Sequence, residues 1–381
     1  MKALGIVSEY NPFHNGHKYH LNRSLELSGA DILIVVMSGN FTERGEAAIE
    51  NKYERSKIAC ENGANLVLEL PLIYATQNAG DFARGGIGIL EGMGCDFISF
   101  GVEDPNEILD LSRFISSNGI LIEEEIKTYV KEGLSYPKAR ENVIINKLGD
   151  KYSEILKKPN NILAIEYLNN MKESKPIFVK RNFVGHNEEY NKTYASGSYI
   201  RKLISQNSDY SQFIPYDYTF KNTNFDQMLF EELRTIILKE DELYLNSIYG
   251  AEEGLGDILK KNVRYYNSYS DVIASLKSKR YTETRVRRVI LNTILGIRKE
   301  DILNLPLYGR VLAFDEKGKA YLNELKKTDN KFPIITNINK VKDEGIKKSL
   351  KYDILGNDLY NKFTGNDLYL NSDFVKVPSR F

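Results

Sequence analysis

Residues 4–17 read LGIVSEYNPFHNGH, and this stretch decides the fold. Its first four residues form a short apolar run with β-branched members, a pattern typical of a strand buried inside a parallel sheet. A polar loop with Asn11, Pro12 and Gly16 follows, and the apolar spacing beyond it predicts a helix over residues 17–28. A buried strand, a loop and a helix in this order predict the first unit of a parallel α/β sheet.

The same alternation continues along the chain. Apolar runs predict further strands at residues 32–37, 65–70, 97–102 and 176–183. The segments between them predict helices at residues 50–62, 81–93 and 106–116 and a helical insertion over 123–171. Strands that alternate with helices imply parallel pairing through crossover helices, so we expect an α/β fold with a Rossmann-like parallel sheet.

A polar stretch at residues 206–209 marks the expected boundary between two domains. Residues 1–210 form the expected nucleotide-binding domain, which includes the helical insertion. Residues 211–381 form the expected C-terminal domain, predicted to be mainly helical over 225–300 and a mixture of short strands and turns over 306–381.

The composition excludes several classes of protein. The 381 residues include 52 basic and 52 acidic ones, so a uniformly basic surface is excluded, although a local basic patch is still compatible with zero net charge. Two cysteines, Cys60 and Cys95, cannot form a metal cage by themselves and suggest a reducing compartment. The N-terminal apolar run is too short for a signal peptide, and no apolar run reaches membrane-spanning length. We therefore expect a cytoplasmic protein.

Three of the four histidines lie in the loop and helix start that follow the first strand: His14, His17 and His20. Ligands of open parallel sheets bind at the carboxyl ends of the strands, and a helix N-terminus there attracts phosphate. Gly16 allows the backbone to approach a ligand closely. The imidazoles of His14 and His17 could therefore stabilise charge on a phosphorus under attack, with His20 one turn further along the helix.

Two other interpretations of these histidines remain open. They could bind zinc together with His186, but zinc sites usually add acidic or cysteine ligands, and no cysteine lies near the loop. They could also be purely structural. Their position directly after the first strand favours contact with phosphate.

The histidine loop and several later motifs resemble the HIGH-motif nucleotidyltransferase superfamily, and most closely the bacterial tRNA(Met) cytidine acetate ligase family. The resemblance is collinear over most of the chain and is carried by 5–17 (GIVSEYNPFHNGH), 38–46 (SGNFTERGE), 65–71 (NLVLELP), 101–103 (GVE), 159–163 (PNNIL) and 279–282 (KRYT). The sequence departs from the family pattern at Glu43 and Ala47, where the family has Gln and Pro, and at Gly197 and Tyr199, where it has Thr and Ala.

The resemblance implies a nucleotidyltransferase-type sheet and an ATP-dependent activation of acetate to acetyl-adenylate. The acetyl group then passes to the wobble cytidine of elongator tRNA(Met), giving N4-acetylcytidine. The resemblance implies ATP as a substrate and Mg²⁺ as a bridge between phosphate oxygens. The residues expected to perform catalysis are His14, His17, Lys18 and Arg44. Those expected to contact ATP are Val7, Ser8, Glu9, Tyr10, Asn11, Pro12, Phe13, Gly16, His20, Gly101, Asn161, Arg181, Ser198 and Arg201.

Several of these positions also have a simpler structural interpretation. Arg44 could bind the acetate carboxylate or tRNA, or could pair with Glu46. Gly101 could approach adenosine or simply end a strand, and Asn161 could cap a helix instead of contacting the nucleotide. Ser196 or Ser198 could cap a helix whose Arg201 reaches phosphate, although Arg201 could equally be a solvated helix residue.

A basic stretch occupies residues 260–299. It carries nine more basic than acidic residues, and Tyr265, Tyr266, Tyr269 and Tyr281 lie among them. The apolar spacing of the helix over 283–295 buries one face, so we expect Arg285, Arg287 and Arg288 to lie on or beside the exposed face. Exposed basic residues with aromatic neighbours favour single-stranded RNA, although a solvated face is the simpler interpretation. The predicted RNA-binding residues are Lys279, Arg280, Arg285 and Arg288.

Two alternative functions follow from the same residues. An adenylyltransferase acting on a phosphorylated cofactor precursor would share the histidine loop but would not need the basic stretch. A non-catalytic RNA-binding or nucleotide-sensing protein is the other alternative, and the intact His14 and His17 pair argues against it.

Overall fold

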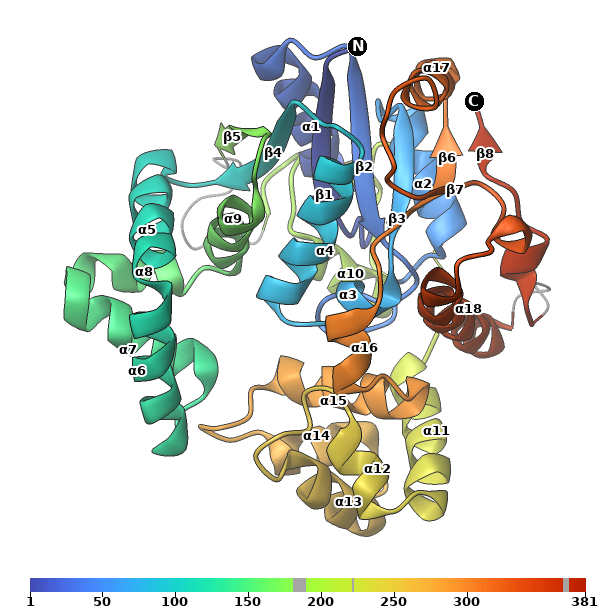
Figure 1. The fold of residues 1–381 in the computed structure, drawn as a ribbon. Helices are drawn as coiled ribbons and strands as arrows, with labels where there is room; N and C mark the ends of the chain where they lie inside the picture. The colour runs from blue at the N-terminus through green and yellow to red at the C-terminus, as the bar shows by residue number, and fades with distance from the viewer. Residues whose placement is uncertain (181–189, 221–222, 366–369) are drawn as a thin grey trace.

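The computed structural model of the protein describes residues 1–180, 190–220, 223–365 and 370–381. Within these residues a mixed sheet of eight strands has the order β5-β4-β1-β2-β3-β6-β7, with β8 beside β6 (Figure 1). Five strands are parallel: β1 Ala3–Ser8, β2 Ile32–Ser38, β3 Leu66–Leu70, β4 Phe97–Val102 and β5 Lys175–Lys180. The predicted parallel α/β sheet is confirmed, and only residues 181–183 of the expected fifth strand lie outside the described residues.

Helices cover both faces of this sheet, because successive side chains of a strand point to opposite sides. Helices α1 Asn15–Ser28 and α2 Lys52–Glu61 share a core with Leu4 and Val35 on one face. Helix α4 Ala79–Gly92, preceded by the short α3 Leu72–Ala75, shares a core with Val36 on the other face. Gly86 allows α4 to approach β1 closely, since a Cβ at this position would lie 2.8 Å from the Val7 side chain.

Several helices begin at side chains that accept hydrogen bonds from the first free backbone N–H groups. Asn51 caps α2 and Asn78 caps α4 in this way. Ser196 caps α10 Gly197–Ser205 by accepting from the N–H of Tyr199 at 3.2 Å, which confirms one of the two caps predicted for this helix. These caps fix where each helix starts relative to the carboxyl edge of the sheet.

The segment between β4 and β5 is a helical insertion. It comprises α5 Pro105–Ser117, α6 Gly119–Lys131, α7 Tyr136–Leu148, α8 Ser153–Leu156 and α9 Pro159–Asn170. Helix α9 packs against α4 and so attaches the insertion to the sheet, while α5 to α8 project to the side (Figure 1). The predicted helical insertion is confirmed.

Residues 225–304 form a second helical projection, which we call the helical unit. It comprises α11 Phe225–Lys239, α12 Glu242–Ser247, α13 Leu255–Tyr265, α14 Tyr269–Leu276, α15 Glu283–Leu295 and α16 Lys299–Asn304. Figure 1 shows it below the sheet, with the segment before α15 reaching toward the insertion. Within the described ranges, no helix is both long enough and apolar enough to cross a bilayer.

The last part of the chain returns to the sheet. Strand β6 Gly309–Phe314 pairs antiparallel with β3, and β7 Ile334–Ile335 and β8 Ser379–Arg380 pair with β6. The expectation of one separate C-terminal domain over 211–381 is therefore wrong for this part. The physical reason is that β3 would otherwise leave a row of unpaired backbone groups at a sheet edge.

The same region also contains two helices, α17 Glu316–Leu325 and α18 Glu344–Thr364, where only short strands and turns were expected. Helix α18 contains Gly356, and a helix-interior glycine costs about 1 kcal/mol relative to alanine, which hides the helix in the sequence pattern. The glycine has a packing role, because a Cβ at this position would lie 2.2 Å from the side chain of Leu72 in α3.

A buried ionic network attaches the C-terminal segment to the sheet. The ammonium of Lys52 lies 2.8 Å from Glu69 and 3.0 Å from Asp373, and the guanidinium of Arg310 lies 2.8 Å from Asp373. Tyr53 also donates a hydrogen bond to Asp373. These groups come from α2, β3, β6 and the turn before β8, so the network holds distant parts of the chain together.

Candidate active site

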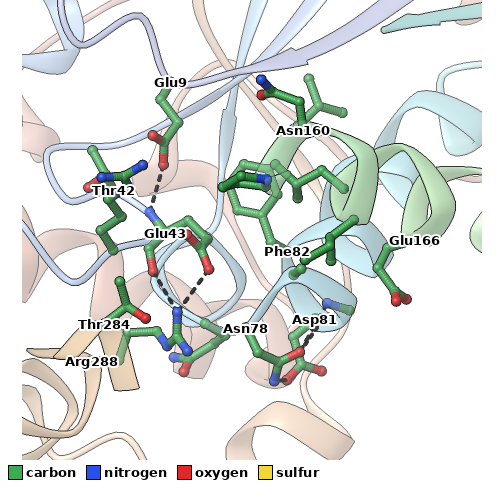
Figure 2. Close-up of a pocket in the computed structure, with 18 of the residues that line it drawn as sticks. Glu9, Thr42, Glu43, Asn78, Asp81, Phe82, Asn160, Glu166, Thr284 and Arg288 are labelled. Carbon is green, nitrogen blue, oxygen red and sulfur yellow. Dashed lines mark hydrogen bonds and ion pairs between the residues drawn. The ribbon is translucent and has the colours of Figure 1, made fainter. Parts of the chain in front are cut away.

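A cavity of about 1180 Å³ opens at the carboxyl edge of the parallel strands. Its walls come from the loops after β1 and β2, the end of β4, the starts of α4, α9 and α10, and the helical unit. Figure 2 shows residues from several of these walls, among them Glu9, Glu43, Asn78, Asn160 and Arg288. Open parallel sheets bind their ligands at this edge. The cavity therefore lies where the sequence predicted the nucleotide site.

The loop after β1 presents the two predicted catalytic histidines. Tyr10 adopts a left-handed backbone conformation with φ of 49°, and its ring packs 4.8 Å from those of Phe13 and His17. The rings of His14 and His17 stack with centroids 3.6 Å apart. The backbone N–H of His14 donates to Nδ1 of His17 at 3.2 Å, so a neutral His17 carries its proton on Nε2 and can donate it.

The N-terminus of α1 lies in this wall of the cavity, and His14 occupies the position just before its first residue. Gly16 leaves room for the imidazole there, because a Cβ would lie 3.0 Å from Cε1 of His14. Oriented N–H groups at a helix start bind anions, and the imidazoles add further donors. This arrangement suits the phosphates of a nucleotide.

A second helix N-terminus, that of α10, meets the same loop. Arg201 donates from Nη1 to the backbone oxygen of Asn11 at 2.7 Å, and a Cβ on Gly197 would lie 3.1 Å from that oxygen. Ser198 and Arg201 both line the cavity. The helix that Ser196 caps therefore lies beside the histidine loop, and Arg201 is not a solvated side chain.

The loop after β2 forms the opposite wall. The backbone N–H of Glu43 donates to Oε1 of Glu9 at 2.6 Å, and Arg288 of α15 donates to Oε1 of Glu43 at 2.8 Å (Figure 2). Burial raises the pKa of Glu9 to about 7, partly opposed by the hydrogen bond from Glu43. Arg44 is exposed at the cavity wall, and its suggested partner Glu46 lies instead 3.8 Å from Arg287.

The arginines of α15 do not lie on an open surface, so that expectation is wrong. The side chains of Arg285, Arg287 and Arg288 are only 23%, 16% and 14% exposed, because acidic residues from outside the basic stretch face them. Arg285 lies 3.0 Å from Glu253, for example. Arg280, Arg285 and Arg288 line the cavity, whereas Lys279 is exposed outside it.

The far wall of the cavity holds polar residues that the sequence analysis missed. Asn78 donates to Asp81 at 2.7 Å, and Tyr249 of the helical unit also donates to Asp81. Arg140 and Glu166 of the insertion form an ion pair at 2.6 Å. Asn78 could have been identified from the sequence as the cap residue of a helix, α4. The sequence could not show that the insertion and the helical unit face this residue.

Most of the predicted nucleotide-contacting residues line the cavity, but several do not. Those that do are Val7, Ser8, Glu9, Tyr10, Asn11, Gly16, His20, Gly101, Ser198 and Arg201. His20 also lies 3.2 Å from the Ser99 hydroxyl. Pro12 and Phe13 are buried and do not line the cavity, and the predicted catalytic residue Lys18 is exposed and does not line it either. Arg181 and the suggested zinc ligand His186 lie outside the described residues.

Asn161, which was predicted to contact the nucleotide, does not line the cavity. Its side chain is buried and donates to the backbone oxygen of Ile155 at 3.3 Å, whereas its neighbour Asn160 lines the cavity (Figure 2). The alternative of a helix cap is wrong, because α9 begins at Pro159 with Lys158 as its cap residue. Contact of Asn161 with the nucleotide stays a prediction. The helical rotation of about 100° per residue explains why the adjacent asparagine faces the ligand space.

Comparison with known proteins agrees with this geometry. The family model described as HIGH Nucleotidyl Transferase matches residues 1–372. The chain is 37% identical to the tRNA(Met) cytidine acetate ligase of Thermoanaerobacter sp. (strain X514), over 98% of both chains. It is 36% identical to the protein of the same name from Clostridium perfringens, over the full length of both.

The chain belongs to the tRNA(Met) cytidine acetate ligase family. Two crystal structures of Thermotoga maritima TmcAL superpose on it over the whole of both chains. The form bound with alpha-thio ATP has a TM-score of 0.88 at 29% identity, and the apo form has 0.89 at 28%. The resemblance inferred from the sequence motifs is therefore confirmed at the level of the tRNA(Met) cytidine acetate ligase family.

Proposed function

We propose that this chain is an ATP-dependent ligase. It activates acetate as acetyl-adenylate and transfers the acetyl group to the wobble cytidine of elongator tRNA(Met), giving N4-acetylcytidine. The observation that carries the proposal is the His14 and His17 pair at the N-terminus of α1, opening into a cavity that basic side chains of the helical unit also line. Relatives named tRNA(Met) cytidine acetate ligase support the choice of substrates.

In the first step, an acetate oxygen attacks the α-phosphorus of ATP and pyrophosphate leaves. His14, His17 and the N–H groups at the start of α1 stabilise the charge that develops on the phosphate oxygens. Arg201 and the start of α10 face the same space and suit the leaving phosphates. Arg44 is an exposed cation in the wall of the cavity and suits the acetate carboxylate.

In the second step, the exocyclic amine of cytidine attacks the acetyl carbonyl carbon and AMP leaves. No covalent enzyme intermediate is required, since acetyl-adenylate is already activated and positioning supplies the rate. The RNA must enter between the insertion and the helical unit, where Arg280 and Arg285 line the cavity and Lys279 lies at its outside. We assign tRNA contact to this side.

Mg²⁺ would accompany ATP in this reaction and neutralise part of the phosphate charge. The described residues contain no group of three or more His, Cys, Asp or Glu side chains arranged to hold a metal ion. Magnesium sites in nucleotide enzymes rely largely on phosphate oxygens and water with one or two carboxylates. The site therefore fits an ion that enters with ATP. A cytoplasmic location also fits the proposed reaction, because Mg·ATP is supplied there.

The same assay tests the proposal and separates it from the alternatives. ATP–pyrophosphate exchange should require acetate, should not require tRNA, and should be followed by acetyl transfer when elongator tRNA(Met) is added. Longer acids should be rejected by about 10–200-fold for each added methylene. Exchange that depends on a phosphorylated precursor would instead identify a cofactor adenylyltransferase. No exchange with any acid would favour a binding protein.

A further inference from the structure

Glu9 has an environment unlike that of the other acidic residues at the cavity. Seven acidic side chains in the described part of the chain line it. Six of them hold an Arg or Lys at 2.6 to 3.8 Å: Glu43, Glu46, Asp81, Glu141, Glu166 and Glu252. Among the same residues, Glu9 has no such ion pair and accepts one hydrogen bond at its carboxylate, from the N–H of Glu43. Glu9 itself lines the cavity.

The position of Glu9 is fixed from two sides. Arg55 donates to its backbone oxygen at 2.5 Å, and Glu43 donates to its side chain at 2.6 Å. Glu43 is in turn held by Arg288, which contacts both its carboxylate and its backbone oxygen. Gly45 lets this loop lie directly on α15, since a Cβ there would be 2.7 Å from the backbone nitrogen of Arg288.

The acetyl-transfer step requires a proton acceptor near the adenylate. His17 accepts from the His14 N–H at Nδ1, so a neutral His17 carries its proton on Nε2 and is a donor rather than a proton acceptor. Six of the seven carboxylates already hold a cation, whereas Glu9 holds none among the described residues. Glu9 is two residues after Val7 on the same loop as the histidines, so it lies beside the expected position of the adenylate.

We propose that Glu9 accepts the proton of the cytidine amine during acetyl transfer, and that Glu43 and Arg288 are positioning residues that hold it for this step. The inference rests on the proposed function. The cytidine nitrogen forms a bond to the acetyl carbonyl carbon, and the bond between that carbon and the AMP oxygen breaks. AMP leaves with the electron pair, and the proton passes from the nitrogen to a carboxylate oxygen of Glu9, which releases it to solvent.

The protonation behaviour of Glu9 suits this role. Burial raises its pKa to about 7, the Glu43 N–H opposes that shift, the Glu43 charge adds to it, and the charges of Arg44 and Arg201 oppose it. A base is most effective when its pKa lies near the working pH. The charged and titratable groups around it come from the loops and helices named above: His14, His17, Glu43, Arg44, Arg55, Tyr167, Arg201 and, through Glu43, Arg288.

The test separates the two chemical steps in the full-length protein. Acetyl-adenylate is formed on the protein from ATP and acetate, elongator tRNA(Met) is added, and acetyl transfer is followed in a single turnover. Glu9→Gln should slow transfer by about 100-fold or more, and by at least tenfold more than it slows ATP–pyrophosphate exchange. Transfer by the unaltered chain should rise with pH to a plateau above about pH 7, and Glu9→Gln should lose this rise.

Two further variants keep the test decisive. Glu43→Gln keeps the N–H to Glu9 but removes a neighbouring negative charge, so the rise of transfer with pH should move to lower pH. Glu166→Gln makes the same change at an ion-paired carboxylate of the cavity and should keep the rise in place. Equal losses of exchange and transfer in Glu9→Gln, or an unchanged pH profile in both Glu9→Gln and Glu43→Gln, would overturn the inference. Absence of acetate-dependent exchange in the unaltered chain would instead overturn the proposed function.

Discussion

The backbone N–H of Ser135 donates a hydrogen bond to the carbonyl oxygen of Lys279 at 3.0 Å. Ser135 lies at the start of α7 in the insertion, and Lys279 precedes α15 in the helical unit. Both Ser135 and the neighbouring Arg280 line the cavity. The two projections seen in Figure 1 therefore touch beside the substrate space.

We expect Ser135→Pro to open this contact. Proline fits the φ of −68° at Ser135 but has no N–H, and the serine side chain makes no capping hydrogen bond. The hydrogen bond that proline removes is worth about 0.5–1.5 kcal/mol, so amide hydrogen exchange in residues 277–282 should accelerate several-fold. Lys279→Ala keeps the carbonyl acceptor and is the matched control. Unchanged exchange in Ser135→Pro would show that the two projections are held together elsewhere.

His17→Ala should reduce acetate-dependent ATP–pyrophosphate exchange by about a hundredfold or more, the usual loss for one donor to transition-state charge. His17→Asn keeps an N–H donor and should therefore lose less of the exchange activity. Thermal unfolding of both variants should stay close to that of the unaltered chain, since His17 is only partly buried. If exchange in His17→Ala matched that of the unaltered chain, the phosphate role of the histidine would be wrong.

tRNA affinity should depend most on basic residues that have no acidic partner. Lys261 and Arg264 of α13 are exposed beside Tyr265, and Lys279 is exposed near the cavity; in the described ranges none of the three forms an ion pair. Replacing two of them by Ala should weaken tRNA binding and reduce the salt dependence of log K by about 0.7–0.9 for each phosphate that is no longer neutralised. Filter binding across a salt series measures both.

The corresponding double variant of Arg285 and Arg288 should behave differently. Arg288 contacts Glu43 in the wall of the cavity, so its removal should also reduce ATP–pyrophosphate exchange. We therefore expect this double variant to lose ATP–pyrophosphate exchange as well as tRNA affinity. Loss of tRNA affinity with unchanged exchange would show that the two arginines act on RNA binding alone.

Asp373→Asn should destabilise the fold by about 3–5 kcal/mol, because Lys52 and Arg310 would keep their charges in a buried site with less compensation. Burial acts to raise the pKa of Asp373, but these two cations outweigh it and hold the pKa well below its usual range. This contribution to stability is present above the unfolded pKa of about 3.9 and is lost as the pH falls below it. Urea unfolding at pH 7 and pH 3 measures both effects, with the more exposed Asp358→Asn as control.

The parallel strands and the histidine site were predictable because their signals are local. A buried strand such as β2 is a continuous apolar run, and the histidine loop follows β1 directly in the sequence. The walls supplied by the insertion and the helical unit were not predictable, since Arg288 meets Glu43 only through the three-dimensional arrangement. The excess of basic residues over 260–299 likewise could not show that acidic residues from other parts of the chain pair with them in the structure.

Two further features of the structure were not predicted from the sequence, and the physical cause is the same for both. Asn160 and Asn161 differ only by one step of helical rotation, which no composition or spacing argument resolves. Helix α18 contains a glycine, Gly356, that is needed for packing against α3. Because glycine disfavours helix, the local sequence of this segment argues against the helix that it forms. In both cases the tertiary context decides what the local sequence leaves open.

The pairing of β3 with β6 has a consequence for biosynthesis. Leu66 lies opposite Phe314, so the edge of the N-terminal sheet stays uncovered until the ribosome has released nearly the whole chain. An uncovered strand edge invites pairing with other chains, and long-range strand pairing is slow. Nascent chains that stop before residue 309 should therefore aggregate or recruit chaperones, and a truncated nucleotide-binding half should not serve as an independent module.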